Sequence, residues 1–181
     1  MKVIEDNINL DGKFLTELPK LQDVRVYGHF DCYHNLLTSL EGAPMEVDGN
    51  FNCRNNKITS LKHAPKKLGI AFIASNNPLI SLEGCPKDAR SFSFYNCGLT
   101  DLNGAPEIVK GNFICANNKL TSLKGGPTRV DFDFNCSGNK ILSLEGCPEY
   151  VGGNFECYDN DGIEFTEEQI RAVCDVGGRV L

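Results

Sequence analysis

A phenylalanine recurs with a nearly constant period along most of this 181-residue chain. The spacing is 21 residues in every interval except one, which is 20. The positions are Phe30, Phe51, Phe72, Phe92, Phe113, Phe134 and Phe155. Proline keeps the same period, and the missing residue falls between Pro86 and Phe92. A fixed period of this length predicts a solenoid, in which each repeat forms one coil and packs only on its neighbours.

Each repeat carries the pattern of a β-strand. Around the best-preserved unit, FICANNKLTSLKGGPTRV, the residues Val109, Gly111, Phe113 and Cys115 alternate with polar or variable residues. A period of two indicates a strand with one buried face. We therefore expect seven parallel strands, one per coil, in a single concave sheet about 30 Å across. Too few residues remain in each coil for a helix, so the convex side should be extended or 3₁₀.

Two further columns of residues follow the same period. A glycine stands two residues before the proline in most repeats, which predicts a turn with positive φ, and His63 interrupts this column. Five residues after each phenylalanine stands an asparagine, or a cysteine in one repeat. The glycines are Gly42, Gly84, Gly104, Gly125 and Gly146, and the second column is Asn35, Asn56, Asn77, Cys97, Asn118, Asn139 and Asn160. A buried amide both donates and accepts, so we expect this second column to pair backbone groups of its own and adjacent coils.

The strand segment with its Asn/Cys position resembles the leucine-rich-repeat consensus, with phenylalanine and cysteine in place of two leucines. The short proline-containing unit is similar to repeats of bacterial type III effectors and of phage-encoded repeat proteins. The resemblance covers about residues 26–161. It implies a leucine-rich-repeat solenoid that binds a partner protein on its concave sheet, and a phage protein of this kind would inhibit a host protein. Ubiquitin-ligase activity, which some similar effectors carry in a separate following domain, is not expected here.

The two ends of the chain are predicted to cap the solenoid. Residues 1–25 contain INLDGKFLTELP, which echoes the LTSL part of the unit without its strand, so we interpret them as a degenerate N-terminal cap. Residues 162–181 should form a short C-terminal capping helix. Thr166 and Gln169 have the spacing of a capping box, and Ile170, Val173 and Cys174 would lie on one buried helix face.

The nine cysteines are interpreted as core residues. Five of them occupy the same inward position, namely Cys32, Cys53, Cys115, Cys136 and Cys157. No Cys-x-x-Cys pair exists and the total is odd, so nine free thiols are expected, with disulfides between adjacent coils and a zinc site as less favoured alternatives.

Two catalytic or metal-binding interpretations are weaker than the structural one. Cys32 and His34 form the strongest nucleophile–base pair, although a strand would place Cys32 inward and His34 at the turn. Cys157, Asp159, Asp161, Gly162 and Glu168 have the spacing of a calcium-binding loop, but Cys157 already belongs to the inward column. We therefore predict a protein that is not an enzyme and that uses no cofactor or metal.

Charge and hydropathy exclude other classes of partner. The chain has 18 basic and 24 acidic residues, a net charge of −6, and no basic stripe, so nucleic-acid binding is not expected. The N-terminal MKVIEDNINLDG lacks the apolar stretch of a signal peptide, and no segment has the length of a membrane span. These features favour a cytoplasmic protein, which we expect to be a monomer, and the resemblance to effector and phage repeats implies a bacterium or an infected host cell as its setting.

The strand residues between the buried ones are the candidate partner-binding surface. Tyrosine, arginine and isoleucine at such positions have the composition of interface centres. The candidates are Tyr33, Arg54, Ile73, Tyr95, Ile114, Asp133, Glu156 and Tyr158. Acidic residues in the C-terminal half suggest a partner with a basic patch. Two other interpretations remain: the isoleucines serve strand propensity alone, or the protein is a structural subunit that self-assembles or joins a larger particle.

Overall fold

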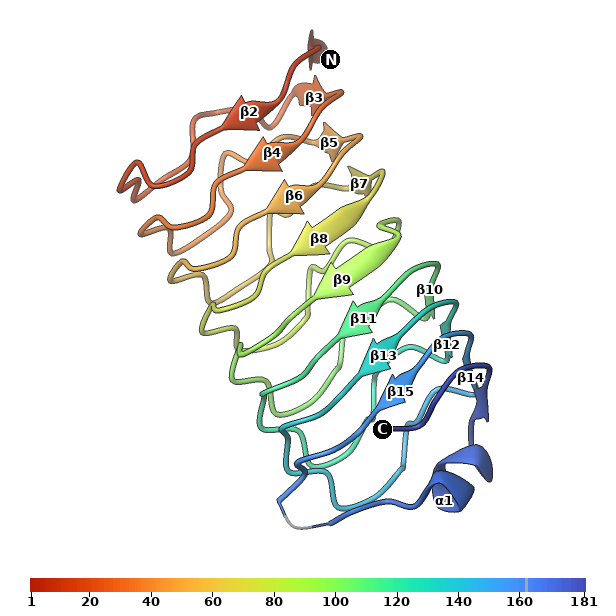
Figure 1. The fold of residues 1–181 in the computed structure, drawn as a ribbon. Coiled ribbons are helices and arrows are strands. Elements are labelled where there is room, and N and C mark those ends of the chain that lie inside the picture. The colour runs from red at the N-terminus through yellow and green to blue at the C-terminus, as the bar shows by residue number, and fades with distance from the viewer. Residues whose placement is uncertain (162) are drawn as a thin grey trace.

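The computed structural model describes residues 1–161 and 163–181. The chain forms a parallel β-solenoid in which coils of about 21 residues stack along one axis, with the termini at opposite ends (Figure 1). The front of the solenoid is an eight-stranded parallel sheet, called the front sheet below. Its strands are, in spatial order, β2 (Ile8–Asn9), β4 (Phe30–Asp31), β6 (Phe51–Asn52), β8 (Ala71–Ile73), β9 (Ser91–Ser93), β11 (Phe113–Ile114), β13 (Phe134–Asn135) and β15 (Phe155–Glu156).

The front sheet is in register at the phenylalanines, as the period predicts. Phe30 pairs with Phe51, Phe51 with Phe72, and the same register continues to Phe155. The rings are fully buried and stack along the axis, with centroids of Phe30 and Phe51 5.1 Å apart. The front sheet has eight strands and not the expected seven, because Ile8–Asn9 in the predicted N-terminal cap pairs with β4.

A second layer of strands lies behind the front sheet and was not expected. One four-stranded sheet consists of β1 (Lys2–Ile4), β3 (Val24–Val26), β5 (Glu46–Val47) and β7 (Lys67–Leu68). Another consists of β10 (Ile108–Val109), β12 (Arg129–Val130), β14 (Tyr150–Val151) and β16 (Asp175–Val176).

The alternating segment is therefore two short strands and not one. Between β5 and β6 the chain bends at residues 48–50, so that Val47 belongs to the second layer and Phe51 to the front sheet. At this corner adjacent coils approach closely. A Cβ on Gly49 would lie 2.7 Å from the carbonyl oxygen of Gly28, which explains the glycine at this position. The period of two in the sequence correctly predicted which residues are buried. It did not reveal that the chain passes from the second layer to the front sheet within the alternating segment.

The 20-residue coil divides the second layer into its two sheets. Ala89 is buried where other coils place valine or leucine, and no strand forms there. The backbone N–H groups of Arg90 and Ser91 both donate to the carbonyl oxygen of Ile70, at 2.9 and 3.1 Å. Phe94 fills the inward position of this coil, with its ring centroid 6.1 Å from that of Phe72. The deletion thus removes one second-layer strand while the front sheet continues.

The asparagine column forms the expected ladder. Asn118 is representative: its Nδ2 donates to the carbonyl oxygens of Phe94 (2.8 Å) and Cys115 (2.9 Å), and its Oδ1 accepts from the N–H of Leu99 (3.0 Å). Each bond to the preceding coil ties one turn to the next. At Cys97 the thiol donates to the carbonyl oxygen of Ala74 (3.3 Å), so that this contact with the preceding coil is kept without an amide.

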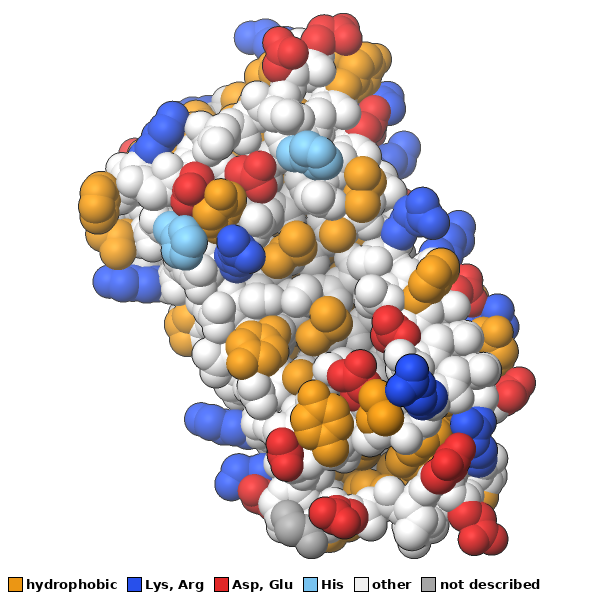
Figure 2. All heavy atoms as spheres, in the orientation of Figure 1, with side chains coloured by type: hydrophobic (Ala, Val, Ile, Leu, Met, Phe, Trp, Pro, Cys, Tyr) orange, Lys and Arg blue, Asp and Glu red, His pale blue; other side chains and the backbone are white. Residues whose placement is uncertain are grey.

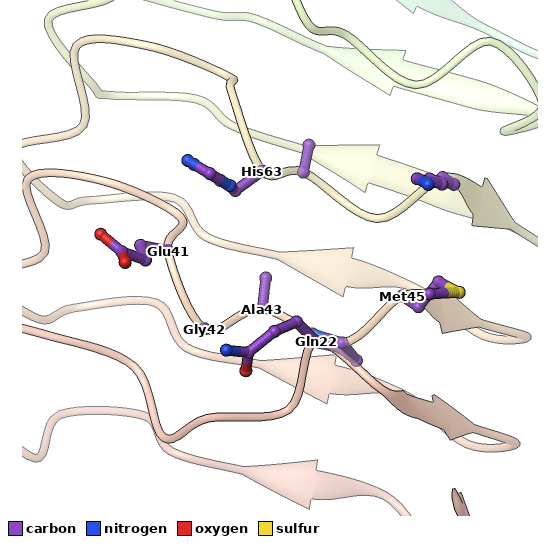
Figure 3. A pocket seen from close by; sticks show the side chains of 9 residues that line it. Gln22, Glu41, Gly42, Ala43, Met45 and His63 are labelled. Atoms are coloured by element: carbon purple, nitrogen blue, oxygen red, sulfur yellow. The ribbon is translucent and has the colours of Figure 1, made fainter. Parts of the chain in front are cut away.

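The turns at the back of the coils have the expected backbone conformation. The five column glycines have φ values of 92, 86, 93, 77 and 80°, and His63 takes the same region at 70°. The segments between turns are extended, with no 3₁₀ helix in residues 1–161 and 163–181. The His63 side chain extends beside Gln22 and Glu41 of the two preceding coils, around a surface pocket of about 370 Å³ (Figure 3).

The C-terminal end contains helix α1 (Glu167–Arg171), which is five residues long. The capping box is present: Gln169 N–H donates to Thr166 Oγ1 and Thr166 N–H donates to Gln169 Oε1. Ile170 is buried, but Val173 is 49% exposed because the helix ends before it.

The chain after α1 returns to the repeat pattern. β16 pairs with β14, and Val180 bridges to Phe155, so the final residues form another strand–bend–strand unit on the last coil. The capping helix expected over 162–181 is therefore only part of what lies on this end. Among the described residues no helix has both the length and the apolar character to cross a membrane.

Removing one amide of the asparagine ladder should lower stability strongly. We expect Asn118→Ala to reduce the free energy of unfolding by about 3 kcal/mol, because buried backbone groups of two coils lose their partners. Urea unfolding followed by circular dichroism measures the effect. Asn103→Ala, the same change at an exposed side chain, should alter stability by less than about 0.5 kcal/mol; equal losses in the two variants would contradict the importance of the ladder.

Restoring glycine in the turn column should stabilise the protein. His63 is held at φ 70°, where a residue with a Cβ is strained. We expect His63→Gly to raise the free energy of unfolding by about 1 kcal/mol, after allowing for the greater entropy of glycine in the unfolded chain. His34→Gly, also at a left-handed position, serves as a comparison. A lower urea midpoint for His63→Gly would show that its side-chain contacts outweigh backbone strain.

Candidate protein-interaction face

The outward side chains of the front sheet form the face on which all predicted binding residues lie. We call this surface the front face; Figure 2 views it directly. Its side chains fall into three columns, which begin at His29, Asp31 and Tyr33 and advance by one coil at a time. The three columns differ in the burial of their side chains and in the hydrogen bonds that these side chains make within the solenoid.

The first column is a second hydrogen-bond ladder that the sequence interpretation missed. Each side chain accepts from the backbone N–H of the residue at the same position in the next coil. The bonds run from His29 N–H to Asn7 Oδ1 (2.7 Å), Asn50 N–H to His29 Nδ1 (2.9 Å), Asn112 N–H to Ser91 Oγ (3.1 Å), Asp133 N–H to Asn112 Oδ1 (3.0 Å), Asn154 N–H to Asp133 Oδ1 (2.8 Å) and Arg179 N–H to Asn154 Oδ1 (3.0 Å). The signal was available in the sequence, because nearly every member is an acceptor that directly precedes the repeat phenylalanine.

This ladder is interrupted near the middle of the solenoid. Ala71 offers no acceptor, and Asn50 Oδ1 is buried without a hydrogen-bond partner among the described residues. The interruption lies next to the short coil that divides the second layer. The first-column ladder and the strand pairing of the second layer are therefore both broken at this level of the solenoid. The front sheet crosses this level without a gap, and the asparagine column crosses it with Cys97 in place of one amide.

Asp133, one of the predicted binding residues, belongs to the first ladder. Its Oδ1 accepts from Asn154 N–H, and its side chain is half-buried. The residue therefore has a structural role in addition to the negative charge it presents. A substitution at Asp133 changes the fold's axial bonding as well as the surface.

The second column holds the two candidate isoleucines and Glu156. Ile73 and Ile114 are half-buried, one on each side of Ser93 along the column. Glu156 accepts a short hydrogen bond from Asn135 Nδ2 in the preceding coil. This column is therefore less exposed than the sequence interpretation assumed, and its isoleucines contribute to packing over the strands as well as to the surface.

The third column carries the most exposed candidates. Tyr95 and Tyr158 are 41% and 49% exposed, and Arg54 is also exposed. Tyr33, Tyr95 and Tyr158 stand three coils apart, so neighbouring tyrosines are separated by roughly 14 Å along the axis at 4.8 Å per strand. Of the residues that lie between these tyrosines, Ser75, Ala116 and Ser137 are small and buried, whereas Arg54 is exposed. The tyrosines thus form ridges across the column, and the small buried residues form shallow floors between them.

The N-terminal part of the third column is a preassembled cluster. The guanidinium carbon of Arg54 lies 4.9 Å from the centre of the Tyr33 ring, a cation–π arrangement. Asp11 of the preceding coil raises the pKa of Tyr33, chiefly through a hydrogen bond with its hydroxyl. His34 Nδ1 lies 3.4 Å from Asp11 Oδ1. These contacts hold Tyr33 and Arg54 in place on the front face.

The structure separates the members of the two weaker site interpretations. Cys32 is fully buried, and burial raises the pKa of its thiol well above the ordinary value, whereas the His34 side chain is exposed and paired with Asp11. In the calcium-loop spacing, Cys157 is in the core and Glu168 is on α1, while Gly162 lies outside the described residues. Within residues 1–161 and 163–181 no group of three or more His, Cys, Asp or Glu side chains is placed to hold a metal ion.

The fold and this face define the chain as a repeat protein of the parallel β-solenoid class, with coils of about 21 residues. Comparison with protein-family models, with curated proteins and with solved structures found no match to this chain.

The double role of Asp133 is testable through stability. We expect Asp133→Ala to lower the free energy of unfolding by about 1 to 2 kcal/mol, because Asn154 N–H loses a charged acceptor. Glu149→Ala removes an exposed carboxylate and should leave the urea midpoint nearly unchanged. Unchanged stability in Asp133→Ala would assign this side chain to the surface alone.

Proposed function

We propose that this protein is a non-enzymatic interaction module that binds a partner protein on its front face. The observation that carries the proposal is the third column, in which three tyrosines and the exposed Arg54 are separated by small buried residues. Rigid aromatic side chains and a stacked arginine contribute strongly to interface energy, because they bury large areas at low entropic cost. The floors at Ser75, Ala116 and Ser137 offer room for partner side chains between the ridges.

The charge of the front face supports a partner with a basic patch. Asp133 lies on one coil, and Glu156 and Asp159 lie on the next, towards the C-terminal end of the face. Figure 2 shows acidic side chains gathered over this part of the surface. Asp133 and Glu156 are hydrogen-bonded to uncharged N–H groups, so their negative charge is not neutralised locally. Opposite charges on a partner would steer its approach and fix its orientation.

Catalysis is not part of the proposal. The thiols of the inward column are buried, and burial raises the pKa values of Cys32, Cys53 and Cys115, which disfavours the nucleophilic thiolate. We therefore propose that the exposed tyrosines, Arg54 and the carboxylates of the front face contact a partner without catalysing a reaction.

The resemblance to the short leucine-rich repeats of bacterial effectors and phage proteins suggests where such a binding protein would act. The asparagine ladder and the exposed strand residues support a leucine-rich-repeat-like solenoid. We propose a cytoplasmic role in a bacterium or an infected host cell, in which a phage-encoded version would inhibit a host protein by covering its surface.

Self-assembly is the second candidate function, and the N-terminal end favours it. β1 and β2 are the edge strands of their sheets, each paired on one side only. Val3 on β1 is exposed, and Phe14 in the following turn is 80% exposed. An unpaired edge beside apolar side chains can accept a strand of another chain.

Affinity capture with a double variant tests the front face. The wild-type protein, Arg54→Ala/Tyr95→Ala, and the control Ile80→Ala, which changes an exposed apolar side chain in the LTSL segment outside the front sheet, are immobilised and exposed to bacterial lysate. We expect a partner retained by wild type and Ile80→Ala and lost at least tenfold in the double variant, with weaker retention at high salt.

Two outcomes would contradict the proposal. A partner retained equally by the double variant would remove the front face from the interaction. Concentration-dependent multimers of the purified wild type in light scattering, with no partner retained, would instead support self-assembly through the N-terminal edge.

A further inference from the structure

The two ends of the solenoid differ in how their outermost strands are covered. At the C-terminal end, the Arg171 guanidinium donates to the carbonyl oxygens of Val176 (2.6 Å) and Gly178 (2.9 Å), which lie in and just after β16. This end, with α1, lies opposite the N-terminus along the axis (Figure 1). A further strand therefore cannot pair with β16 unless it displaces Arg171.

The apolar core is less completely covered at the N-terminal end. The core side chains of the first coil are only half-buried, whereas the residues at the same positions of the next coil are fully buried. The half-buried set is Ile4, Ile8, Leu10 and Leu15, and the buried set is Val26, Phe30, Cys32 and Leu37. The first coil therefore presents apolar surface that another layer could cover.

The outer edge of β1 is open for backbone pairing. Lys2 N–H donates to the residue before β3 at 3.0 Å, and the Ile4 carbonyl oxygen accepts from the residue after β3 at 2.9 Å. Because alternate residues of a strand direct their backbone groups to opposite sides, Val3 and Glu5 direct theirs away from β3. Val3 is also 44% exposed. These groups can pair with a strand of another chain.

The outer edge of β2 is less available than that of β1. The Asn9 side chain folds back along it, and its Oδ1 accepts from Asp11 N–H at 2.9 Å. A strand that approached β2 would have to displace this side chain. β1 is therefore the strand at this end that a further chain can extend.

The sequence of β1 and its continuation is complementary in charge to a second copy of itself. Lys2 is followed four residues later by Asp6, and within residues 1–161 and 163–181 neither side chain forms an ion pair. An antiparallel pair about a two-fold axis at Ile4 sets each Lys2 opposite Asp6 of the other copy. In the same register Ile4 meets Ile4, and Val3 and Glu5 exchange backbone hydrogen bonds.

We propose that two copies of this chain form a closed two-fold dimer in which their β1 strands pair antiparallel at Ile4. The proposal rests on the self-assembly considered above, and it names the partner, the edge and the stoichiometry. Since Arg171 covers β16, the far ends of the dimer carry no open edge of this kind, and association stops at two copies. This dimer replaces the monomer expected from the sequence.

The dimer leaves both front faces free. The paired strands belong to the second layer, whereas the third column of the front face projects from the front sheet. Each dimer would therefore carry two sites for the partner protein. Two linked sites bind a partner that has repeated copies of the recognised surface more tightly than one site does.

Sedimentation equilibrium of the whole chain, with its N-terminus unmodified, tests the proposal. We expect the wild type to pass from 19.9 kDa to about twice that mass, and no further, at concentrations up to about 0.5 mM. Val3→Pro removes an N–H that faces away from β3, and proline is tolerated on an edge strand, so this variant should stay folded and monomeric. The matched control Val3→Thr keeps the N–H and should dimerise.

Charge reversal tests the register. Asp6→Lys alone, or Lys2→Asp alone, sets like charges opposite each other at two places in the dimer. Each should raise the dissociation constant at least about fivefold. The double variant Lys2→Asp/Asp6→Lys restores opposite charges and should return to within about twofold of the wild-type dissociation constant.

Four results would overturn the proposal. They are a wild type that stays monomeric throughout the concentration range, a dimer that persists in Val3→Pro, species larger than a dimer, and a double charge variant no tighter than the single ones. Failure of the front-face proposal gives a different pattern. Arg54→Ala/Tyr95→Ala should dimerise like wild type, and Val3→Pro should still retain from lysate any partner that wild type retains.

Discussion

The structure depends on satisfying backbone polar groups from one coil to the next. Each coil is too short to contain a helix or a hairpin, so few of its N–H and C=O groups can pair within the coil itself. The parallel strands pair part of them, and the asparagine column pairs groups at the turn that leaves the front sheet. The first column of the front face does the same at the turn that enters it. Because all three networks run along the axis, every coil must keep the same register.

That constraint explains how the solenoid absorbs its one irregular coil. A missing residue between Pro86 and Phe92 could shift the register of everything that follows, yet Phe92 pairs with both Phe72 and Phe113. The loss is confined to the corner, where a second-layer strand is absent and Arg90 and Ser91 share one acceptor. Phe94 fills the volume inside the coil. The front sheet is preserved at the expense of the second layer, which carries fewer of the axial contacts.

The same networks determine which surface is left for function. A side chain that accepts from the next coil cannot vary freely, and this removes most of the first column from a binding role. The second column is half-buried among its neighbours. The third column has the exposed tyrosines and Arg54, and the interaction proposed for this protein therefore rests mainly on it.

The sequence by itself determined the coil length, the stacked phenylalanines, the asparagine ladder and the left-handed turns. These features repeat, and residues at equal positions of successive coils are stacked, so a period in the sequence directly reports contacts along the axis. Only the tertiary structure decided the corner that divides each predicted strand in two, the hydrogen-bonding role of Asp133, and the extra strands at both ends. These depend on close approach within or between coils, as at Gly49, or on terminal segments such as 175–181 whose similarity to the repeat is too weak to recognise alone.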